Sequence, residues 1–351
     1  MVNIRILKNI IFSIGYWILA SILYTITRYG AIEIELDLYD NVGFVPDDII
    51  SAITFGLFAG IFLGLFESYE SMIYKKRKSF TFVLSTKTGI YILIFYLGSL
   101  LQITFEDRSL YKGMSFIFSR AELIALVNFT LYSFLFHFVR LMNKSMGPGI
   151  LFEYLIGKYF NPREEERIFL FIDLKSSTTI AEKIGHKSYS SLIQECFMEL
   201  TKPILKFQGH VYQYVGDEVV VTWEMHQGIK NLNCIHFFYS FLDELKRMKN
   251  YFINKFEIFP EFKAGMSSGW VTVAEVGELK SEISYHGDVL NTASRLQGLC
   301  NDYGKKMLIS ESIYTEIEQK NTYNFNFIGN LQLKGKKQTV KIYAVEEKER
   351  I

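Results

Sequence analysis

The amino-acid sequence predicts an α-helical membrane domain of four helices followed by an α+β domain. The chain of 351 residues has an apolar fraction of 49% and a mean hydropathy of +0.14, both high for a wholly soluble protein. The long apolar runs all lie in the first 145 residues. Beyond them come an apolar strand, a helix and a hairpin in succession, which indicates a mixed α and β domain.

Four apolar runs are long enough to cross a membrane as helices. Each contains about 17–20 residues and is nearly free of charge, and they cover about 10–27, 49–66, 88–105 and 123–139. A cleaved signal peptide is a poor alternative for the first run, because no small-residue cleavage site follows it and three more runs do. We therefore expect residues 1–145 to form a multi-pass domain in the inner or plasma membrane, in contact with lipid.

Basic residues predict which ends of the spans face the cytoplasm. Arg5 and Lys8 precede the first span, YKKRK lies between the second and third, and Arg140 and Lys144 follow the fourth. The loop after the first span, AIEIELDLYD, is acidic. The positive-inside rule then assigns the N-terminus and everything after residue 145 to the cytoplasm.

Polar side chains within the spans are few, and they include Lys87, Asn128 and His137. One interpretation is a site for a ligand or quinone, because ionisable groups in a membrane are costly. We favour the alternative that they snorkel or form interhelical hydrogen bonds.

A linker of residues 146–165 separates the membrane domain from the predicted catalytic domain, 166–347. It begins with the breaker Gly-Pro-Gly, continues as an amphipathic helix through about Phe160 and stops at Asn161-Pro162. Such a helix either transmits movement between the two domains or only spaces them.

The overall charge and the cysteines and histidines exclude several classes of function. A net charge of +1 and a pI of about 7.6 give no field that would attract nucleic acid. Cys196, Cys234 and Cys300 have neither a CxxC spacing nor a disulfide pattern, so we expect buried thiols. The six histidines lack the spacing of a zinc site.

Two aspartates suggest a metal site in the C-terminal half. The run RIFLFIDL predicts a buried central strand that carries Asp173 near its end. Asp217 follows Gly216 at the turn of a predicted hairpin from Val211 to Trp223, where the simplest explanation is that Asp suits turns. A lone aspartate in so apolar a strand is costly, whereas two aspartates that share a cation are not. The pair therefore suggests a palm-like domain with two-metal phosphoryl chemistry.

Ser176, Ser177 and Thr178 begin a predicted helix directly after the Asp173 strand. The free N–H groups of that helix terminus would favour an anion such as a phosphate.

Four motifs in this order resemble the catalytic domain of class III adenylate and guanylate cyclases: FIDLKSST, YVGDEVVV, SYHGDVLNTASRL and LQLKGKKQTVKIYAV. The resemblance covers about Arg167 to Val345 and leaves the membrane region unassigned. It implies a ferredoxin-like or palm fold, a nucleoside triphosphate substrate, and a product that is the 3′,5′-cyclic monophosphate with pyrophosphate. It also implies a head-to-tail homodimer whose sites combine residues from both subunits.

The resemblance also assigns roles to single residues. Asp173 and Asp217, with the backbone carbonyl of Leu174, would bind two Mg²⁺ (or Mn²⁺) ions per active site. Asn291 and Arg295 would orient the ribose and stabilise the transition state, and they are i, i+4 neighbours on one helix face. The resemblance also implies that Lys334 binds the triphosphate, although KGKK is equally compatible with a solvated turn between two strands.

The residues that would read the base depart from the family pattern. Gln213 and Ser284 stand where adenylate cyclases usually have Lys and Asp or Thr, and where guanylate cyclases have Glu and often Cys. Both side chains donate and accept hydrogen bonds, so we expect weak discrimination. Family frequency favours ATP, with GTP or a pyrimidine nucleotide as alternatives.

Two other functions fit the sequence less well. Diguanylate cyclases share a GDE hairpin, but their glycine pair is replaced here by Val215-Gly216, and NTASR is not expected in them. A membrane receptor with an inactive cyclase-like module is disfavoured, because both aspartates and Arg295 are present.

Overall fold

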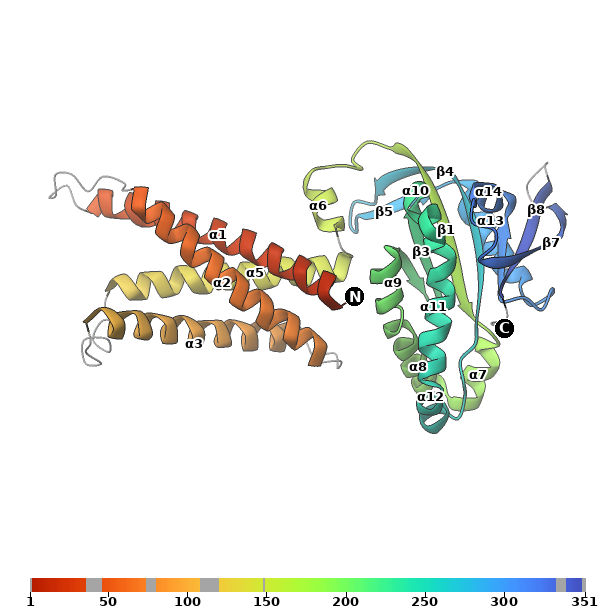
Figure 1. The fold of residues 1–351 in the computed structure, drawn as a ribbon, viewed down its shortest axis with the longest axis horizontal. Coiled ribbons are helices and arrows are strands. Elements are labelled where there is room, and N and C mark those ends of the chain that lie inside the picture. The colour runs from red at the N-terminus through yellow and green to blue at the C-terminus, as the bar shows by residue number, and fades with distance from the viewer. Residues whose placement is uncertain are drawn as a thin grey trace. The chain divides into compact units, whose positions relative to one another are not determined.

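The chain forms two compact units, Met1–Met146 and Gly147–Ile351 (Figure 1). A computed structural model describes residues 2–35, 46–73, 80–107, 120–147, 149–332 and 339–348. Each unit has its own hydrophobic core.

The first unit consists, within the described residues, of four long helices: α1 (Val2–Glu35), α2 (Pro46–Ile73), α3 (Phe80–Asp107) and α5 (Arg120–Met146). Its core is mainly aromatic and includes Trp17, Tyr91, Phe129 and Phe136. Helix α1 continues to Glu35, so the start of the predicted acidic loop is helical.

Three of these helices are long and apolar enough to cross a membrane, through Asn9–Thr27, Ile49–Tyr69 and Leu123–Met146. In α3 the apolar stretch among the described residues is shorter, Thr81–Tyr96. The part of the chain that the structure describes thus supports three spans where the sequence predicted four. Three such helices indicate membrane association.

Helices α1 and α2 approach closely because α2 has a glycine at every fourth position along the contact, Gly56, Gly60 and Gly64. A Cβ atom at Gly60 would lie 2.4 Å from the Cα atom of Ile14 on α1. No side chain larger than hydrogen fits there unless the helices separate, as is typical of small-residue helix packing in membranes.

A buried carboxylate joins three helices of the first unit. Glu67 on α2 is 2% exposed and accepts a hydrogen bond of 2.5 Å from Lys87 Nζ on α3. On α5, His137 Nδ1 and Arg140 Nη1 lie 3.6 and 3.5 Å from the same carboxylate. Lys87 and His137 therefore make interhelical contacts, whereas the Asn128 amide bonds a carbonyl of its own helix.

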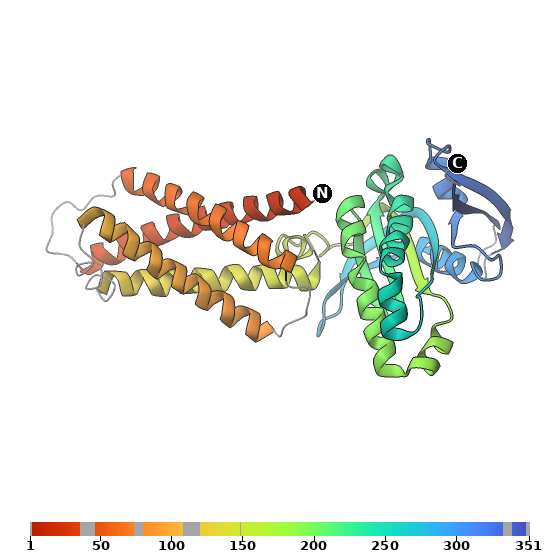
Figure 2. The same cartoon turned by 60° about the horizontal axis from the view of Figure 1, so that its bottom comes forward.

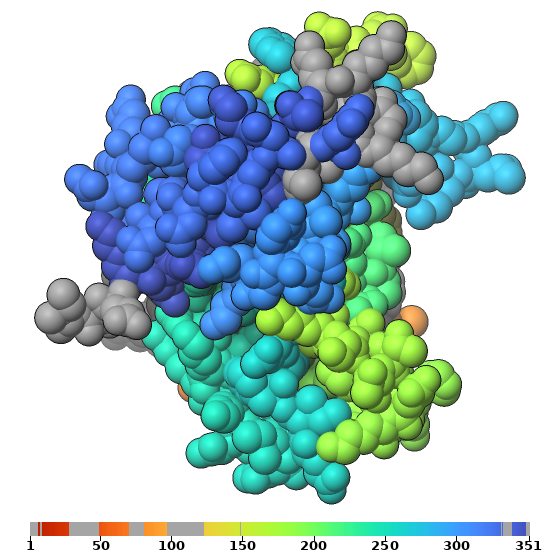
Figure 3. Space-filling model, turned by 90° about the vertical axis from the view of Figure 1, so that its right-hand side faces the viewer, coloured from red at the N-terminus to blue at the C-terminus, as the bar shows by residue number. Residues whose placement is uncertain are grey.

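The second unit is an α+β domain built on an eight-stranded sheet in the order β2-β3-β1-β4-β6-β8-β7, with β5 paired to β4. Only β4 and β6 are parallel among these pairs. The strands are β1 (Arg163–Leu174), β2 (His210–Val215), β3 (Glu218–Glu224), β4 (Phe262–Val276), β5 (Glu282–His286), β6 (Met307–Ser310), β7 (Tyr323–Gln332) and β8 (Thr339–Glu347). The tip of the β4–β5 hairpin extends from the surface, and Leu279 there is fully exposed (light blue in Figure 3).

Helices cover both faces of this sheet (Figures 1 and 2). They are α7 (Ser177–Ile184), α8 (His186–Met198), α9 (Thr201–Phe207), α10 (Met225–Ile229), α11 (Asn233–Arg247), α12 (Lys249–Phe256), α13 (Asp288–Leu299) and α14 (Glu311–Glu316), with a 3₁₀ turn at Lys230–Leu232. The order of β1, helices, β2, β3, helices and β4 confirms the predicted ferredoxin-like palm arrangement.

The apolar part of strand β1, from Ile168 to Leu174, packs into a core on each face of the sheet, as its sequence predicts. Its even-numbered residues from Ile168 to Leu174 belong to the core that includes residues of α8, α9 and α11. Phe169 and Phe171 belong to the other core, with Ala293 of α13. Because side chains alternate along a strand, Asp173 lies on the α13 face.

The linker helix α6 is shorter than predicted and spans Ile150–Leu155 instead of continuing to Phe160. Gly157 explains the early end, because its φ of 62° is left-handed and stops a right-handed helix.

We predict that Gly60→Ala destabilises the first unit by about 1–3 kcal/mol, because the added methyl group overlaps the α1 backbone. Gly89→Ala on α3 is the matched control, since its Cβ would meet nothing within 4 Å. Thermal unfolding of the full chain in detergent measures both. Equal midpoints for the two variants would contradict the close α1–α2 packing.

Candidate functional site

The two predicted metal-binding aspartates lie at the same end of neighbouring antiparallel strands. Asp173 pairs with Glu218 of β3 in the sheet register, and Asp217 directly precedes that residue in the β2–β3 turn. Gly216 has a φ of 61°, the left-handed conformation that favours glycine. The turn thus brings Asp217, 44 positions later in the chain, beside Asp173.

Asp173 is flanked in the sheet by a like charge and an opposite charge. Glu218 lies opposite it on β3, and Lys263 lies opposite it on β4. Lys263 Nζ is 3.5 Å from Asp173 Oδ2, and Gln297 Nε2 of α13 donates to the same oxygen at 2.8 Å. Burial and then the charge of Asp217 raise the pKa of Asp173.

Asp217 has an unsatisfied oxygen. Its Oδ2 atom is buried and has no hydrogen-bond partner among the described residues. An unpaired buried carboxylate oxygen beside a second carboxylate is costly unless a cation binds there. The described residues contain no cluster of three or more His, Cys, Asp or Glu side chains able to hold a metal ion. Two carboxylates completed by phosphate oxygens and water are nevertheless the ligand set that Mg²⁺ uses on nucleotides.

Four side chains around the pair were not predicted. Lys263 and Gln297 are both 7% exposed and fix the position of Asp173. Burial, together with Asp173 and Asp217, raises the pKa of Glu218 to about 7. Tyr189 of α8 also lies beside the pair, where burial and then Asp217 raise its pKa to about 12. Only Glu218 had a sequence signal, its place in the GDE turn.

The helix N-terminus predicted to favour phosphate directly follows β1. Ser176 is the N-cap residue of α7 with a left-handed φ of 56°, and its side chain makes no capping hydrogen bond. Ser177 and Thr178 occupy the first turn of α7, whose N–H groups have no partner within the helix. Leu174, whose side chain is buried, ends β1 one residue after Asp173.

Asn291 and Arg295 lie on α13, as predicted, but on a different side of the helix from Gln297. Residues two apart on a helix do not face the same way. Gln297 is buried and bonds Asp173, while Asn291 is exposed and Arg295 half-buried. The structure therefore does not bring the Asn/Arg pair to the aspartates of its own chain.

Gly265 on β4 lets α13 pass close to the sheet. A Cβ atom there would lie 2.1 Å from the backbone nitrogen of Gln297. The absence of a side chain at this position is what allows Gln297 to reach Asp173.

The two predicted base-reading residues lie on separate strands that are not neighbours in the sheet, β2 and β5, and each is followed or preceded by a tyrosine. Gln213 is exposed on the edge strand β2, and Ser284 is half-buried on β5. Their neighbours Tyr212 and Tyr285 pack with ring centroids 5.0 Å apart. Lys334, the predicted phosphate-binding lysine, lies outside the described residues.

The family model and the relatives that match this chain are all cyclases. Residues 161–347, more than half of the chain, match the family model of the adenylate and guanylate cyclase catalytic domain. Adenylate cyclase 2 of Rhizobium meliloti (strain 1021) is 29% identical over 59% of this chain and 57% of its own length. Adenylate cyclase 1 of the same organism is 26% identical over 52% of this chain and 27% of its own length. The chain thus spans less than two thirds of either relative.

A solved structure of a bacterial light-regulated adenylyl cyclase supports the fold. It superimposes with a TM-score of 0.56 at 21% identity and covers 67% of this chain and 69% of that one. The motif order, the sheet topology and the family match agree, and we conclude that this chain belongs to the family of adenylate and guanylate cyclase catalytic domains.

Proposed function

We propose that this chain is a membrane-bound nucleotidyl cyclase. It converts a nucleoside triphosphate, with ATP as the main substrate, to the 3′,5′-cyclic monophosphate and pyrophosphate. The observation that carries the proposal is that the carboxylates of Asp173 and Asp217 lie close enough to interact. The buried Oδ2 atom of Asp217 has no hydrogen-bond partner among the described residues. The family match and the adenylate cyclases among its relatives support it.

Asp173 and Asp217, with the Leu174 carbonyl, would hold two Mg²⁺ or Mn²⁺ ions in each site. When bound, such ions lower the pKa of the ribose 3′-hydroxyl and neutralise phosphate charge. Gln297 and Lys263 both contact Asp173 Oδ2. The N–H groups of Ser177 and Thr178, next to the N-cap Ser176, would orient the triphosphate, and Lys334 would bind it as well.

The reaction is intramolecular. The ribose 3′-hydroxyl gives its proton to water, and its oxygen bonds to the α-phosphorus as the bond from that phosphorus to the bridging oxygen breaks and the electron pair leaves with pyrophosphate. Arg295 would neutralise the charge that develops on the α-phosphoryl oxygens, and Asn291 would hold the ribose.

A head-to-tail homodimer is the assembly we propose, with Asn291 and Arg295 supplied by the second subunit. The direction of Gln297 toward Asp173 supports it, because Asn291 and Arg295 then lie on another side of α13. A symmetric dimer contains two equivalent composite sites.

The proposed topology is four spans, with the N-terminus and catalytic unit in the cytoplasm. Three spans would be the long apolar helices and the fourth the shorter apolar stretch Thr81–Tyr96 of α3, and the basic residues near the predicted cytoplasmic ends support this orientation. Reporter fusions after Phe66 and after Val139 are expected to report cytoplasm. An external signal from either fusion would contradict the four-span topology.

Asp173→Asn and Asp217→Asn should each lower turnover by at least about a hundredfold, because each removes charge that a metal ion needs. The measurement is cyclic nucleotide formation by the full chain with Mg²⁺ and with Mn²⁺. Asp302→Asn is the matched control, since Asp302 is an exposed turn residue. Near-normal activity of either site variant would overturn the metal assignment.

Complementation tests the composite site. Homodimers of Asp173→Ala and of Arg295→Ala should both be inactive, whereas mixing them should restore about a quarter of wild-type activity through one intact site per heterodimer. Differently tagged subunits allow the heterodimer to be isolated. A proven heterodimer without activity would refute the shared site.

The choice of base gives a further test. Because Gln213 and Ser284 both donate and accept hydrogen bonds, we expect selectivity for ATP over GTP below about a hundredfold, or about 2.7 kcal/mol. The enzyme receives each of the four nucleoside triphosphates separately, and mass spectrometry identifies the cyclic product. Strong selectivity for GTP or a pyrimidine nucleotide would show that other residues read the base.

A further inference from the structure

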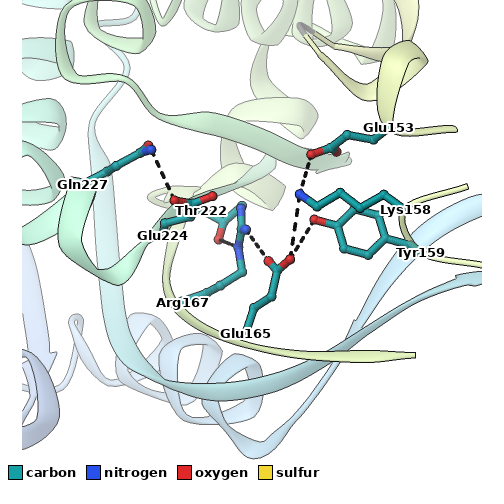
Figure 4. Close-up of polar contacts among 8 residues, drawn as sticks. All are labelled: Glu153, Lys158, Tyr159, Glu165, Arg167, Thr222, Glu224 and Gln227. Atoms are coloured by element: carbon teal, nitrogen blue, oxygen red, sulfur yellow. Dashed lines mark hydrogen bonds and ion pairs between the residues drawn. The ribbon is translucent and has the colours of Figure 1, made fainter. Parts of the chain in front are cut away.

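The linker segment that contains α6 is attached to the catalytic unit through its polar side chains (Figure 4). Lys158 Nζ lies 2.8 Å from Glu153 Oε1 and 3.9 Å from Glu165 Oε1 of β1. Tyr159 donates its hydroxyl to Glu165 at 2.9 Å, and its carbonyl accepts from the backbone N–H of Glu275 at 2.9 Å. These bonds fix one side of the segment on strands β1 and β4.

The same segment presents large apolar side chains to the outside. Phe152, Leu155, Ile156 and Phe160 are 66%, 77%, 58% and 79% exposed, and no residue of α6 is buried. Four exposed large apolar residues within nine positions are costly in water and indicate a partner surface. Polar contacts on one side and free apolar groups on the other are the pattern of an interfacial segment.

This segment directly follows an apolar helix, so the membrane that this helix would enter lies close to it. The apolar helix α5 ends at Met146, and three residues separate it from Ile150. Since a residue extends at most about 3.6 Å, the start of α6 lies within about 14 Å of the end of α5. Lys144 in the last turn of α5 adds a positive charge that suits anionic lipid headgroups.

We propose that Phe152, Leu155, Ile156 and Phe160 insert into the lipid headgroup and acyl boundary and dock the catalytic unit on the membrane surface. The inference rests on the proposed insertion of α5 in the membrane. An interfacial segment of this kind is buried about 5–10 Å deep. The bonds of Lys158 and Tyr159 transmit this anchorage to the catalytic sheet.

Lipid quenching of a fluorophore on the full chain in vesicles tests the proposal. An added cysteine carries an environment-sensitive fluorophore at Leu155→Cys and, separately, at Phe160→Cys. Cys196, Cys234 and Cys300 are buried, so labelling of the folded protein is directed to the added thiol. The membrane control is Val127→Cys, which is exposed on α5, and the aqueous control is Asp302→Cys.

We expect lipids with a spin label near the headgroup to quench the probes at positions 155 and 160 and to leave the probe at 302 unaffected. Emission at 155 and 160 should also shift to shorter wavelength than at 302. Quenching at 127 without quenching at 155 and 160 would overturn the docking and leave the membrane insertion intact. Energy transfer between probes at 155 of two subunits, without lipid quenching, would assign the surface to a second copy. No quenching at 127 would overturn the insertion of α5 and the docking with it.

Discussion

The catalytic unit depends on one electrostatic constraint, the confinement of Asp173 and Asp217 at the end of a buried strand pair. The two half-buried carboxylates repel each other, which destabilises their charged forms, and Glu218 adds a third acid to the cluster. Lys263 and the Gln297 amide offset part of this repulsion, but both act on a single oxygen of Asp173. Asp217 Oδ2 is left without a partner among the described residues. A site of this kind is stable when a divalent cation enters it, because the cation favours the charged form of every acid around it.

Two glycines make this arrangement possible. Gly216 provides the left-handed turn that places Asp217 beside Asp173, and Gly265 leaves the space through which Gln297 approaches. A side chain at Gly265 would overlap the α13 backbone and push Gln297 away from the aspartate. The position of the carboxylates thus depends on backbone conformation and helix packing as much as on the charges themselves. The cost of burying the acids is met by contacts that arise from β2, β3, β4 and α13, so that the site forms only when the domain is folded.

Sequence patterns predicted the parts of the structure that depend on interactions between residues close together in the chain. The apolar run of β1, the Gly216-Asp217 turn and the helix that carries Asn291 each follow from a few neighbouring residues. Gln297 reaches Asp173 across 124 positions of sequence, and no local pattern indicates such a contact. Glu67 was missed for the same reason, because its partners Lys87 and His137 lie on other helices. The linker helix ends early because Gly157 adopts a left-handed conformation, which amphipathic periodicity does not reveal.

The path from the linker to the site runs along a single strand. Glu165 bonds Tyr159 at one end of β1, and Asp173 lies near the other end. Every residue between them is paired in register with β4, and those from Arg167 onward are paired with β3 as well. Arg167, 5% exposed, bonds Glu165 and also the Thr222 hydroxyl of β3, so the linker is tied to both strands that lead to the aspartates (Figure 4). A strand paired on both sides moves as a unit with its neighbours. The linker segment is therefore connected through β1 to the strand end that carries Asp173, and through Arg167 to β3, the strand that directly follows Asp217.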